Sequence, residues 1–493
     1  MNKKIFEVTV FISGFVVLTY EVVGARVLGP YYGTSIFVWT AMIGIILASL
    51  SLGYSLGGKL ADKKDARKAI LSSMLLLASI SIAITYIIRI PLLGYLTATI
   101  HSIRIGSVIA AMILFFPASV FLGMISPYAL KLRLIGEKET GTIIGNMSAL
   151  GTIGSILGTF ITGFYLIPTF GISTILASLP IILGILSLLV DSHDKKYFKI
   201  ISLSLFLLFV GLYKNTSASP NIIDERDTMY SHVQVIEGMN PRLNERVRML
   251  KINVENHSSM SLESNRLINH YTEYYHLIRH FFPDFQHALM IGGAGYSFPK
   301  EYLNTYSGKT IDVVEIDPGI TEVAKQYFFL KEDPRLKIYH EDARVYLNKT
   351  STKYDAIFGD AFTSWFSIPY QLTTSEAIQK QYDSLTESGV LILNLISSLD
   401  GETGEFFRSE YHTFKDIFPE VIVFPTSSQT DGNLMQNIIL IGLKDPHSFH
   451  LNSHDPYIKN MLSTIWTGAI LDDLPRITDD YAPVDYYMSK LLD

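Results

Sequence analysis

The first 213 residues are dominated by long apolar stretches, and this feature constrains the fold more than any other. Most of these stretches are long enough to cross a hydrocarbon core of about 30 Å as a helix. We expect about seven transmembrane helices, of which the seventh has barely enough apolar residues and has an interfacial position as its alternative. The expected spans are Val8–Leu28, Ser35–Leu56, Ile70–Ile88, Ile105–Tyr128, Gly141–Ile167, Ile172–Val190 and Phe198–Leu212.

Positive charges alternate between the ends of these spans. Lysine and arginine in short loops favour the cytoplasmic side. They gather before the first span and after the second, fourth and sixth, at Lys3, Lys4, Lys59, Lys63, Lys64, Arg67, Lys68, Lys131, Arg133, Lys138, Lys195 and Lys196. The Arg89–Arg104 loop is only modestly basic. An odd number of crossings then predicts an integral protein of the cell membrane whose C-terminal part lies outside the cytoplasm.

Two features inside the apolar region have structural interpretations. Glu21 lies about one turn before Arg26, and we interpret the two as an interfacial pair that anchors the first helix, although an intramembrane carboxylate is also a functional candidate. The small residues of Gly151–Gly158 suit close packing between helices. We expect membrane lipid to contact the helix faces that do not pack against other helices.

Charged residues return after a short polar linker, which we place at 214–224. Alternating residues at Ser231–Glu237 and Arg246–Asn253 predict strands of a small β-subdomain at 225–262, and a helix carrying Tyr271 follows. In 263–493 strands alternate with helices, which is typical of a mostly parallel, Rossmann-like α/β sheet. The expected strands are Ala288–Ile291, Ile311–Glu315, Leu336–His340, Ala356–Phe358, Val390–Leu395, Val421–Phe424 and Asn437–Ile441.

A glycine run closes the first strand of this sheet, in His287-Ala-Leu-Met-Ile-Gly-Gly-Ala-Gly295. Glycine lets a backbone approach a ligand closely, so Gly292, Gly293 and Gly295 are candidate nucleoside contacts. Glu315 ends the next strand about 20 residues later, where a carboxylate accepts the hydroxyls of a ribose.

Four candidates share one edge of the predicted sheet. Gly292, Glu315, Asp342 and Asp360 each lie at or just beyond the carboxyl end of a strand, where sheets of this kind bind ligands. For each acid the alternative is a loop residue that caps the following helix.

On these motifs the chain from about Glu225 onward resembles spermidine synthases and related aminopropyltransferases, and the whole chain resembles their membrane-fused branch. The matching blocks are Gly292–Gly295, Val314–Asp317, Asp342–Ala343 and Tyr354–Asp360. The resemblance implies a small β-domain followed by a methyltransferase-like sheet, with decarboxylated S-adenosylmethionine or S-adenosylmethionine as co-substrate. It also implies that Glu315 holds the ribose, that Asp342 with Ala343 meets the adenine, and that Asp360 is the base near an acceptor amine.

The sequence departs from that family at two positions. Tyr296 stands where the glycine loop normally continues with an aspartate, and no second acid follows in Ala361–Pro369. Side chains expected to line the acceptor pocket are Tyr274, Tyr275, His276, Tyr296 and Trp365, and Asp480 of the C-terminal Thr478–Val484 block is a further candidate. Core aromatics and a solvated turn are the alternatives.

Composition excludes several classes of site. The formal charge of -6 and the lack of a basic stripe argue against nucleic acid, and zero cysteines exclude disulfides and thiolate metal sites. His257, His270 and His276 form no helical ligand pair, so we expect no zinc. A homodimer stays open as an oligomeric state.

Three functions remain in competition. The first is a membrane-anchored transferase that alkylates a small-molecule amine, with Asp360 as base. The second is an extracytoplasmic, cofactor-independent enzyme in which Asp360 activates an amine for intramolecular attack, such as cyclisation of the N-terminal glutamine of a peptide. The third is a transporter whose C-terminal domain senses a nucleoside or a polyamine.

Overall fold

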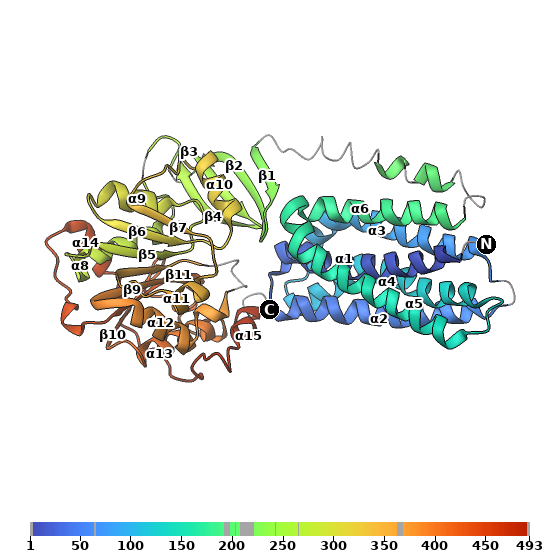
Figure 1. The fold of residues 1–493 in the computed structure, drawn as a ribbon. Helices are drawn as coiled ribbons and strands as arrows, with labels where there is room; N and C mark the ends of the chain where they lie inside the picture. Colours follow the sequence, from blue (N-terminus) through green and yellow to red (C-terminus); the bar gives the residue numbers. More distant parts are fainter. Residues whose placement is uncertain are drawn as a thin grey trace. The chain divides into compact units, whose positions relative to one another are not determined.

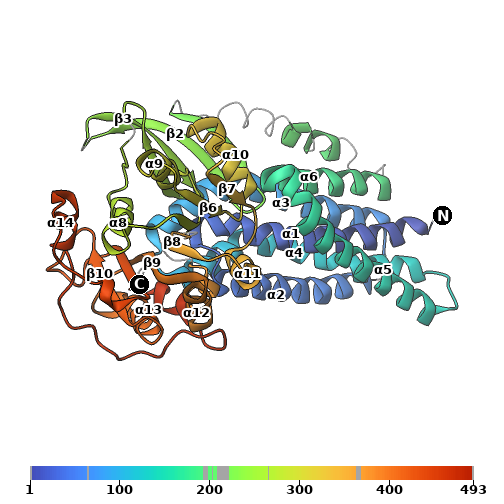
Figure 2. The same ribbon diagram turned by 60° about the vertical axis from the view of Figure 1, so that its left-hand side comes forward.

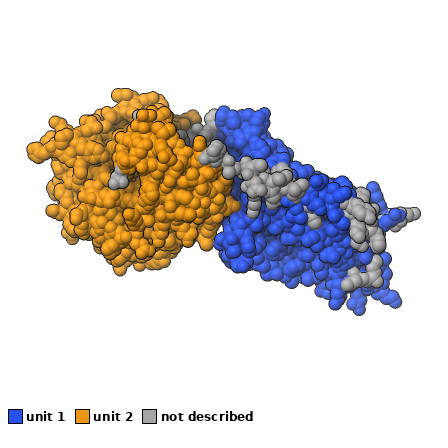
Figure 3. Space-filling model, turned by 90° about the horizontal axis from the view of Figure 1, so that it is seen from above, with its two compact units in different colours: residues 1–219 blue, residues 220–493 orange. Residues whose placement is uncertain are grey.

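The computed structural model of the chain describes residues 3–63, 66–191, 198–202, 204–207, 221–241, 243–264, 266–361 and 368–490. These residues form two compact units, Met1–Ser219 and Pro220–Asp493 (Figure 3). Each unit has its own internal packing.

Long helices make up the N-terminal unit. They are α1 (Lys4–Tyr32), α2 (Ile36–Ala61), α3 (Lys68–Thr99), α4 (Ile103–Leu134), α5 (Thr140–Ile161) and α6 (Ile167–Val190), with a π-helical turn η1 (Thr162–Leu166) between the last two. In the described residues five stretches are long and apolar enough to cross a membrane, and the fifth, Thr140–Val190, joins two of the predicted spans. Gly171 interrupts that stretch with a φ of 71°.

The seventh predicted span lies partly outside the described residues. Its described portion is a shorter apolar helix at Phe198–Leu207. The predicted Arg89–Arg104 loop is wrong, because α3 continues to Thr99 and α4 begins at Ile103. Arg89 is tolerated in the helix since its guanidinium donates to the Tyr86 carbonyl at 2.5 Å and to Ser173 at 3.0 Å.

Glycines allow two helix pairs in this unit to approach within backbone contact. A Cβ on Gly154 of α5 would lie 2.1 Å from the Phe11 carbonyl oxygen of α1, and one on Gly53 of α2 would lie 2.4 Å from the Val120 carbonyl of α4. Any larger residue would push these helices apart. The predicted packing role of the glycines in Gly151–Gly158 is therefore confirmed for Gly154.

The C-terminal unit begins with a four-stranded antiparallel sheet. Its strands β1 (Ile222–Asp227), β2 (His232–Asn240), β3 (Glu245–Ile252) and β4 (Glu255–Ser261) follow one another in chain order. Only β2 and β3 were predicted. The sequence does not predict the edge strands, because β1 is mostly charged and β4 carries polar residues on both faces. Neither strand therefore alternates as a half-buried strand does.

A seven-stranded sheet forms the rest of the unit, in the order β10-β11-β9-β8-β5-β6-β7 (Figure 1). The strands are β5 (His287–Ile291), β6 (Thr310–Val314), β7 (Leu336–Tyr339), β8 (Tyr354–Gly359), β9 (Leu385–Ser397), β10 (Glu420–Pro425) and β11 (Gln436–Leu443). The pairs from β7 to β9 are parallel, whereas β11 runs antiparallel to both β9 and β10. The expected mostly parallel α/β sheet is confirmed.

Helices cover this sheet. They are η2 (His270–Leu277), α8 (Ile278–Phe281), α9 (Ser297–Thr305), α10 (Pro318–Tyr327), α11 (Ala343–Lys349), η3 (Tyr370–Leu372), α12 (Ser375–Ser384), η4 (Glu402–Gly404), α13 (Glu405–Lys415), η5 (Pro446–Ser448), α14 (Pro456–Leu462) and α15 (Val484–Ser489). Helices α12 and α13 lie beside β9 and β10, as Figure 2 shows from a second direction.

Successive residues of each strand enter different cores on the two sheet faces. Met290 of β5 and Phe358 of β8 pack with the small sheet and η2, whereas Leu289 and Ile357 pack with α11, α12 and α13. This alternation follows from the two-residue period of a strand. Both faces of the sheet are therefore buried, so a ligand can reach the sheet only at the ends of its strands.

Glu410 of α13 yields a prediction about stability. It is fully buried, and within the described residues neither carboxylate oxygen has a hydrogen-bond partner. Burial raises its pKa well above the ordinary value. The folded state thus holds a proton that the unfolded chain releases, so above the unfolded pKa stability falls as the pH rises, by at most about 1.4 kcal/mol per pH unit.

Glu410→Gln removes this titration with little change in shape. We expect the thermal midpoint of the variant, relative to the wild type, to rise steadily between about pH 5 and pH 8. Differential scanning fluorimetry across that range measures it. A difference between the two proteins that stays constant with pH would show that Glu410 does not titrate on unfolding.

Candidate active site

The four candidates predicted to share one sheet edge all lie at the carboxyl ends of parallel strands. The glycine run follows β5, Glu315 follows β6, Asp342 comes shortly after β7, and Asp360 follows β8. The strand order reverses between β5 and β8, which is where open α/β sheets bind ligands.

The glycine loop packs directly against the backbone of Asp360. Gly292 has a φ of 94°, and a Cβ there would lie 2.3 Å from the Asp360 carbonyl oxygen. A Cβ on Gly293 would lie 2.7 Å from the ring of Tyr296, and a Cβ on Gly295 would lie 2.6 Å from the Ser258 hydroxyl of β4. These contacts alone require glycine, apart from any ligand.

Glu315 is buried and holds this loop in place. One carboxylate oxygen accepts from the backbone N–H groups of Gly293, at 2.9 Å, and Ala294, at 3.2 Å. The other accepts from the N–H of Asp317 at 2.9 Å. Burial raises the pKa of Glu315 and these three donors oppose the rise. Glu315 thus organises the edge where a nucleoside would lie.

Asp342 caps a helix, which was the alternative interpretation of this residue. Its carboxylate accepts from the Val345 N–H of α11 at 3.1 Å, and Ala343 after it is buried. The next residue, Arg344, donates to Asp479 at 2.7 Å. A cap uses only part of the hydrogen-bonding capacity of a carboxylate, so the side chain remains a candidate contact.

Asp360 is held at both carboxylate oxygens by neutral donors. Asn394 of β9 donates to one oxygen at 2.9 Å, and the Tyr271 hydroxyl of η2 donates to the other at 3.0 Å. Burial raises the pKa of Asp360 against these hydrogen bonds. Burial and the nearby Asp360 carboxylate in turn raise the pKa of Tyr271 and Tyr275.

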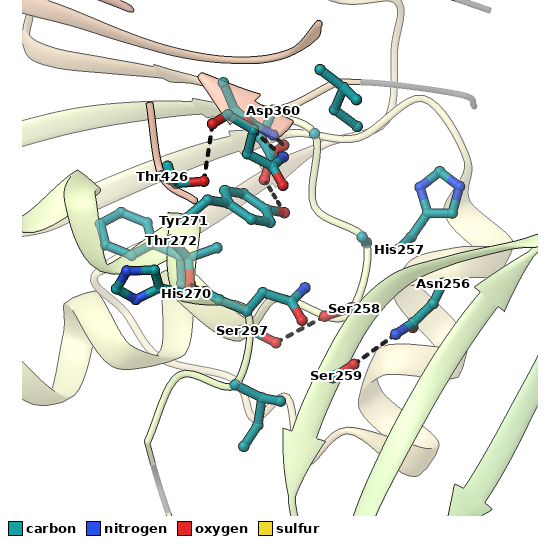
Figure 4. Close-up of a pocket in the computed structure, with 18 of the residues that line it drawn as sticks. Asn256, His257, Ser258, Ser259, His270, Tyr271, Thr272, Ser297, Asp360 and Thr426 are labelled. Atoms are coloured by element: carbon teal, nitrogen blue, oxygen red, sulfur yellow. Dashed lines mark hydrogen bonds between the residues drawn. The ribbon is translucent and has the colours of Figure 1, made fainter. Parts of the chain in front are cut away.

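A cavity of about 400 Å³ opens in front of Asp360 (Figure 4). The glycine loop lines it, and so does β4, which contacts this loop at Ser258, with Asn256, His257 and Ser258. Its further lining includes His270, Thr272, Asn394, Thr426, Gln436 and Asn437. Amides and hydroxyls therefore dominate the surface that faces the candidate base.

Several residues of this site were not predicted as site residues, among them the three nearest to Asp360 in its hydrogen-bond network. Tyr271 was expected only as part of a helix, and Asn394 and Asn437 were expected only as members of strands. Asn394 carried a usable signal, because it is a polar residue within the otherwise apolar run Val390–Ile396. A polar side chain in a buried strand needs a hydrogen-bond partner, which marks the position.

Most of the predicted acceptor residues lie in the core and do not line the cavity. Tyr275 packs against Phe298 and Phe358. The Tyr274 hydroxyl bonds to Thr464 at 3.0 Å. Tyr274 and Tyr275 are thus core aromatic residues, which was the alternative interpretation of their positions.

His276 and Tyr296 are directed away from the cavity too. The His276 ring shares a hydrogen bond with the Tyr306 hydroxyl at 2.6 Å, and burial lowers its pKa to about 4. The Tyr296 hydroxyl bonds to Thr321 at 2.7 Å. Asp480 is exposed in the turn between Thr478 and Tyr481, outside the cavity lining.

Trp365 lies outside the described residues. Across the residues that the structure does describe, no three histidine, aspartate or glutamate side chains come together as a metal site would require.

Comparison with known proteins agrees with this arrangement. Residues 269–436 match the spermine/spermidine synthase domain family. The polyamine aminopropyltransferase of Vibrio vulnificus is 29% identical over 218 residues, which cover 42% of this chain and 71% of that protein. Polyamine aminopropyltransferase 2 of Aquifex aeolicus is 23% identical over 474 residues, 90% of this chain and 88% of that protein.

Among solved structures, a probable spermidine synthase from Corynebacterium glutamicum aligns with 55% of this chain and 94% of its own, at 19% identity and a TM-score of 0.42. The strand order of the C-terminal unit defines an α/β domain with a candidate site at the switch point of its sheet. The chain thus carries a region that matches the spermine/spermidine synthase domain family, and an apolar multi-helix unit precedes it.

Glu315→Gln tests the nucleoside edge. A charge-assisted hydrogen bond contributes about 1.5–3 kcal/mol, so the variant should bind decarboxylated S-adenosylmethionine at least about tenfold more weakly. Isothermal titration calorimetry measures the affinity. Glu322→Gln, on the exposed side of α10 in the same strand–helix unit, is the matched control and should bind as the wild type does. Equal affinity of the Glu315→Gln variant and the wild type would remove Glu315 from the site.

Proposed function

We propose that this protein is a membrane-anchored transferase that moves an alkyl group, in the simplest case aminopropyl, from an S-adenosyl sulfonium to an amine. Asp360 acts as the general base. The observation that carries the proposal is the position of Asp360, which lies at the cavity and in backbone contact with the glycine loop. The base and the nucleoside edge are thereby adjacent.

The reaction needs only one proton transfer, from the amine to the protein. The amine nitrogen forms a bond to the carbon next to sulfur, and the carbon–sulfur bond breaks with its electron pair going to sulfur, which leaves as a neutral thioether. An alkyl amine with a pKa near 10 is mostly protonated at pH 7, so a group that accepts its proton in place assists the attack. Asp360 receives that proton, which then passes to solvent.

The residues at the edge suit the S-adenosyl group. Glu315 and Asp342 are acceptors for the hydroxyl and amino donors of a nucleoside, and the glycines leave room at the backbone. When bound, the sulfonium supplies the electrophilic carbon. The chain's own residues bind the nucleoside, orient the amine and hold its proton.

The proposed base also sets the pH dependence. Protonated Asp360 cannot accept a proton, and burial raises its pKa above that of an ordinary aspartate. Activity should therefore be lost on acidification at a higher pH than an exposed carboxylate would give.

A second candidate is supported by one observation. Tyr296, which replaces the loop aspartate of the family, points into the core, so the loop offers no carboxylate to the amine of an aminopropyl group. The same Asp360 would then serve an intramolecular reaction, in which the amine of an N-terminal glutamine attacks its own side-chain amide carbon and ammonia leaves. The described lining of amides and hydroxyls suits a peptide end.

Anchoring follows from the apolar helices, and the side of the membrane follows from the positive charges. With Lys3 and Lys4 in the cytoplasm and seven crossings, the C-terminal unit lies outside. A phosphatase fused after residue 493, active only when exported, should be active, and a cytoplasmic reporter at the same place should not. The reverse pattern would show that the seventh segment does not cross.

Asp360→Asn should reduce turnover by about 10²–10⁴-fold, because it nearly preserves shape and removes the proton acceptor. The assay is the release of methylthioadenosine from decarboxylated S-adenosylmethionine with putrescine as the first amine tested, and with a wider set of amines after it.

Asp355→Asn is the control from the same strand. Asp355 lies at the opposite end of β8, where it accepts from the backbone N–H groups of Gln286 and His287 at 2.7 Å and 3.1 Å. We expect this variant to lose stability and to keep its turnover once folded. Near-normal turnover of Asp360→Asn would exclude Asp360 as the base, whatever the control does.

A further inference from the structure

Two asparagines stand in line behind the candidate base. Asn394 of β9 is 2% exposed and donates its amide N–H to Asp360 at 2.9 Å. Asn437 of β11 donates its own amide N–H to the Asn394 carbonyl oxygen at 3.0 Å. The three side chains form one chain of hydrogen bonds that runs from β11 through β9 to the end of β8.

The pairing of the strands fixes this line. Asn394 is paired with Ile439 and Asn437 with Ile396, so the asparagines are diagonal neighbours on the same face of antiparallel strands. Such diagonal partners are within reach of longer side chains. The backbone register therefore brings the two amides together without any loop.

The direction of the donors matters because an asparagine amide has two different ends. One end donates and the other accepts, and a half-turn about the last side-chain bond exchanges them. Asn437 donates to the oxygen end of Asn394 and thereby directs the nitrogen end toward Asp360. Without that donor, Asn394 is free to turn its oxygen toward the carboxylate, where it would repel the charge.

We propose that Asn437 is a positioning residue that acts through Asn394 to keep Asp360 ionised and aimed at the cavity. The proposal rests on the proposed role of Asp360 as base. Tyr271 restrains the second oxygen from the opposite side at 3.0 Å, so the carboxylate is fixed by two elements. The lone pairs that remain face the cavity and serve the amine.

Other ionisable groups lie near Asp360. Tyr271 and Tyr275 of η2 adjoin its carboxylate. His270 at the start of η2 and Glu255 and His257 of β4 line the same cavity. Asn437 bonds to Asn394 at 3.0 Å, so a change confined to Asn437 reaches Asp360 through the line of amides.

Loss of a donor to the carboxylate favours its protonated form. Asn437→Leu removes the donor without adding charge and has nearly the same shape. We expect the protonation midpoint of Asp360 to rise by about one pH unit, a tenfold change in proton affinity. Asn394→Leu, which removes the direct bond, should raise it by at least as much.

Infrared difference spectroscopy of the full-length protein during a pH titration measures this midpoint without any substrate. The carbonyl band of the protonated side chain is assigned to Asp360 by its loss in Asp360→Asn. The double variant Asn394→Leu/Asn437→Leu completes a cycle, because residues that act through one another are not additive.

The expected result is a raised midpoint in Asn437→Leu and no further rise when Asn437→Leu is added to Asn394→Leu. An unchanged midpoint in Asn437→Leu, or equal effects of that change with and without Asn394, overturns the proposal. If the leucine variant fails to fold, Asn437→Ala replaces it. Alanine also removes the donor without adding charge, so it should raise the midpoint as well, and a midpoint that stays or falls overturns the proposal.

The same variants distinguish the role of Asn437 as a positioning residue from the role of Asp360 as the general base. Full turnover of Asp360→Asn would end the role of Asp360 as base while the midpoints still report on the asparagines. Loss of turnover in Asp360→Asn with an unmoved midpoint in Asn437→Leu would keep the base and reject the positioning residue.

Discussion

The candidate site depends on two carboxylates that are held by neutral hydrogen-bond donors. Glu315 accepts from the backbone N–H groups of Gly293, Ala294 and Asp317, and Asp360 accepts from Asn394 and Tyr271. Within the described residues neither carboxylate has a lysine or arginine partner. Removing an unpaired charge from water is costly, and several aligned donors offset the cost without neutralising the charge. Burial raises the pKa of both groups, and these donors oppose the rise.

The sheet supplies those donors through its topology. Asp360 and the glycine loop come from adjacent parallel strands at the point where the strand order reverses, and Asn394 comes from the next strand along. Glycine at position 292 permits the loop to reach the Asp360 backbone at a φ of 94°. The antiparallel addition of β11 then brings Asn437 behind Asn394. The proposed binding edge, the proposed base and the proposed positioning amides therefore all follow from one strand order.

The sequence was sufficient to predict the apolar helices, the strands of the main sheet and the shared edge of Gly292, Glu315, Asp342 and Asp360. Those features have strong local signals in hydrophobic periodicity and in glycine at strand ends. The side chain that reaches Asp360 from η2 could not be predicted, because Tyr271 and Tyr275 are both buried aromatics of one short helix. The Tyr271 hydroxyl reaches the carboxylate, whereas Tyr275 packs in the core against Phe298, and only the tertiary contacts of η2 distinguish them.

Helix-capping residues pose the same difficulty. Asp342 caps α11 and also stands where a nucleoside would lie, and the two roles have identical sequence signals. The edge strands β1 and β4 were missed because their polar residues hide the alternation of a strand. In each case tertiary contacts, and not local preference, decide the outcome.

The identity of the product distinguishes the proposed alkyl transfer from the cyclisation reaction. The purified full-length protein is incubated with decarboxylated S-adenosylmethionine and a mixture of amines, and both products are quantified by mass spectrometry. For aminopropyl transfer we expect an amine heavier by one aminopropyl group together with an equal amount of methylthioadenosine. No methylthioadenosine, together with release of ammonia from a peptide that begins with glutamine, would contradict it and favour the cyclisation reaction.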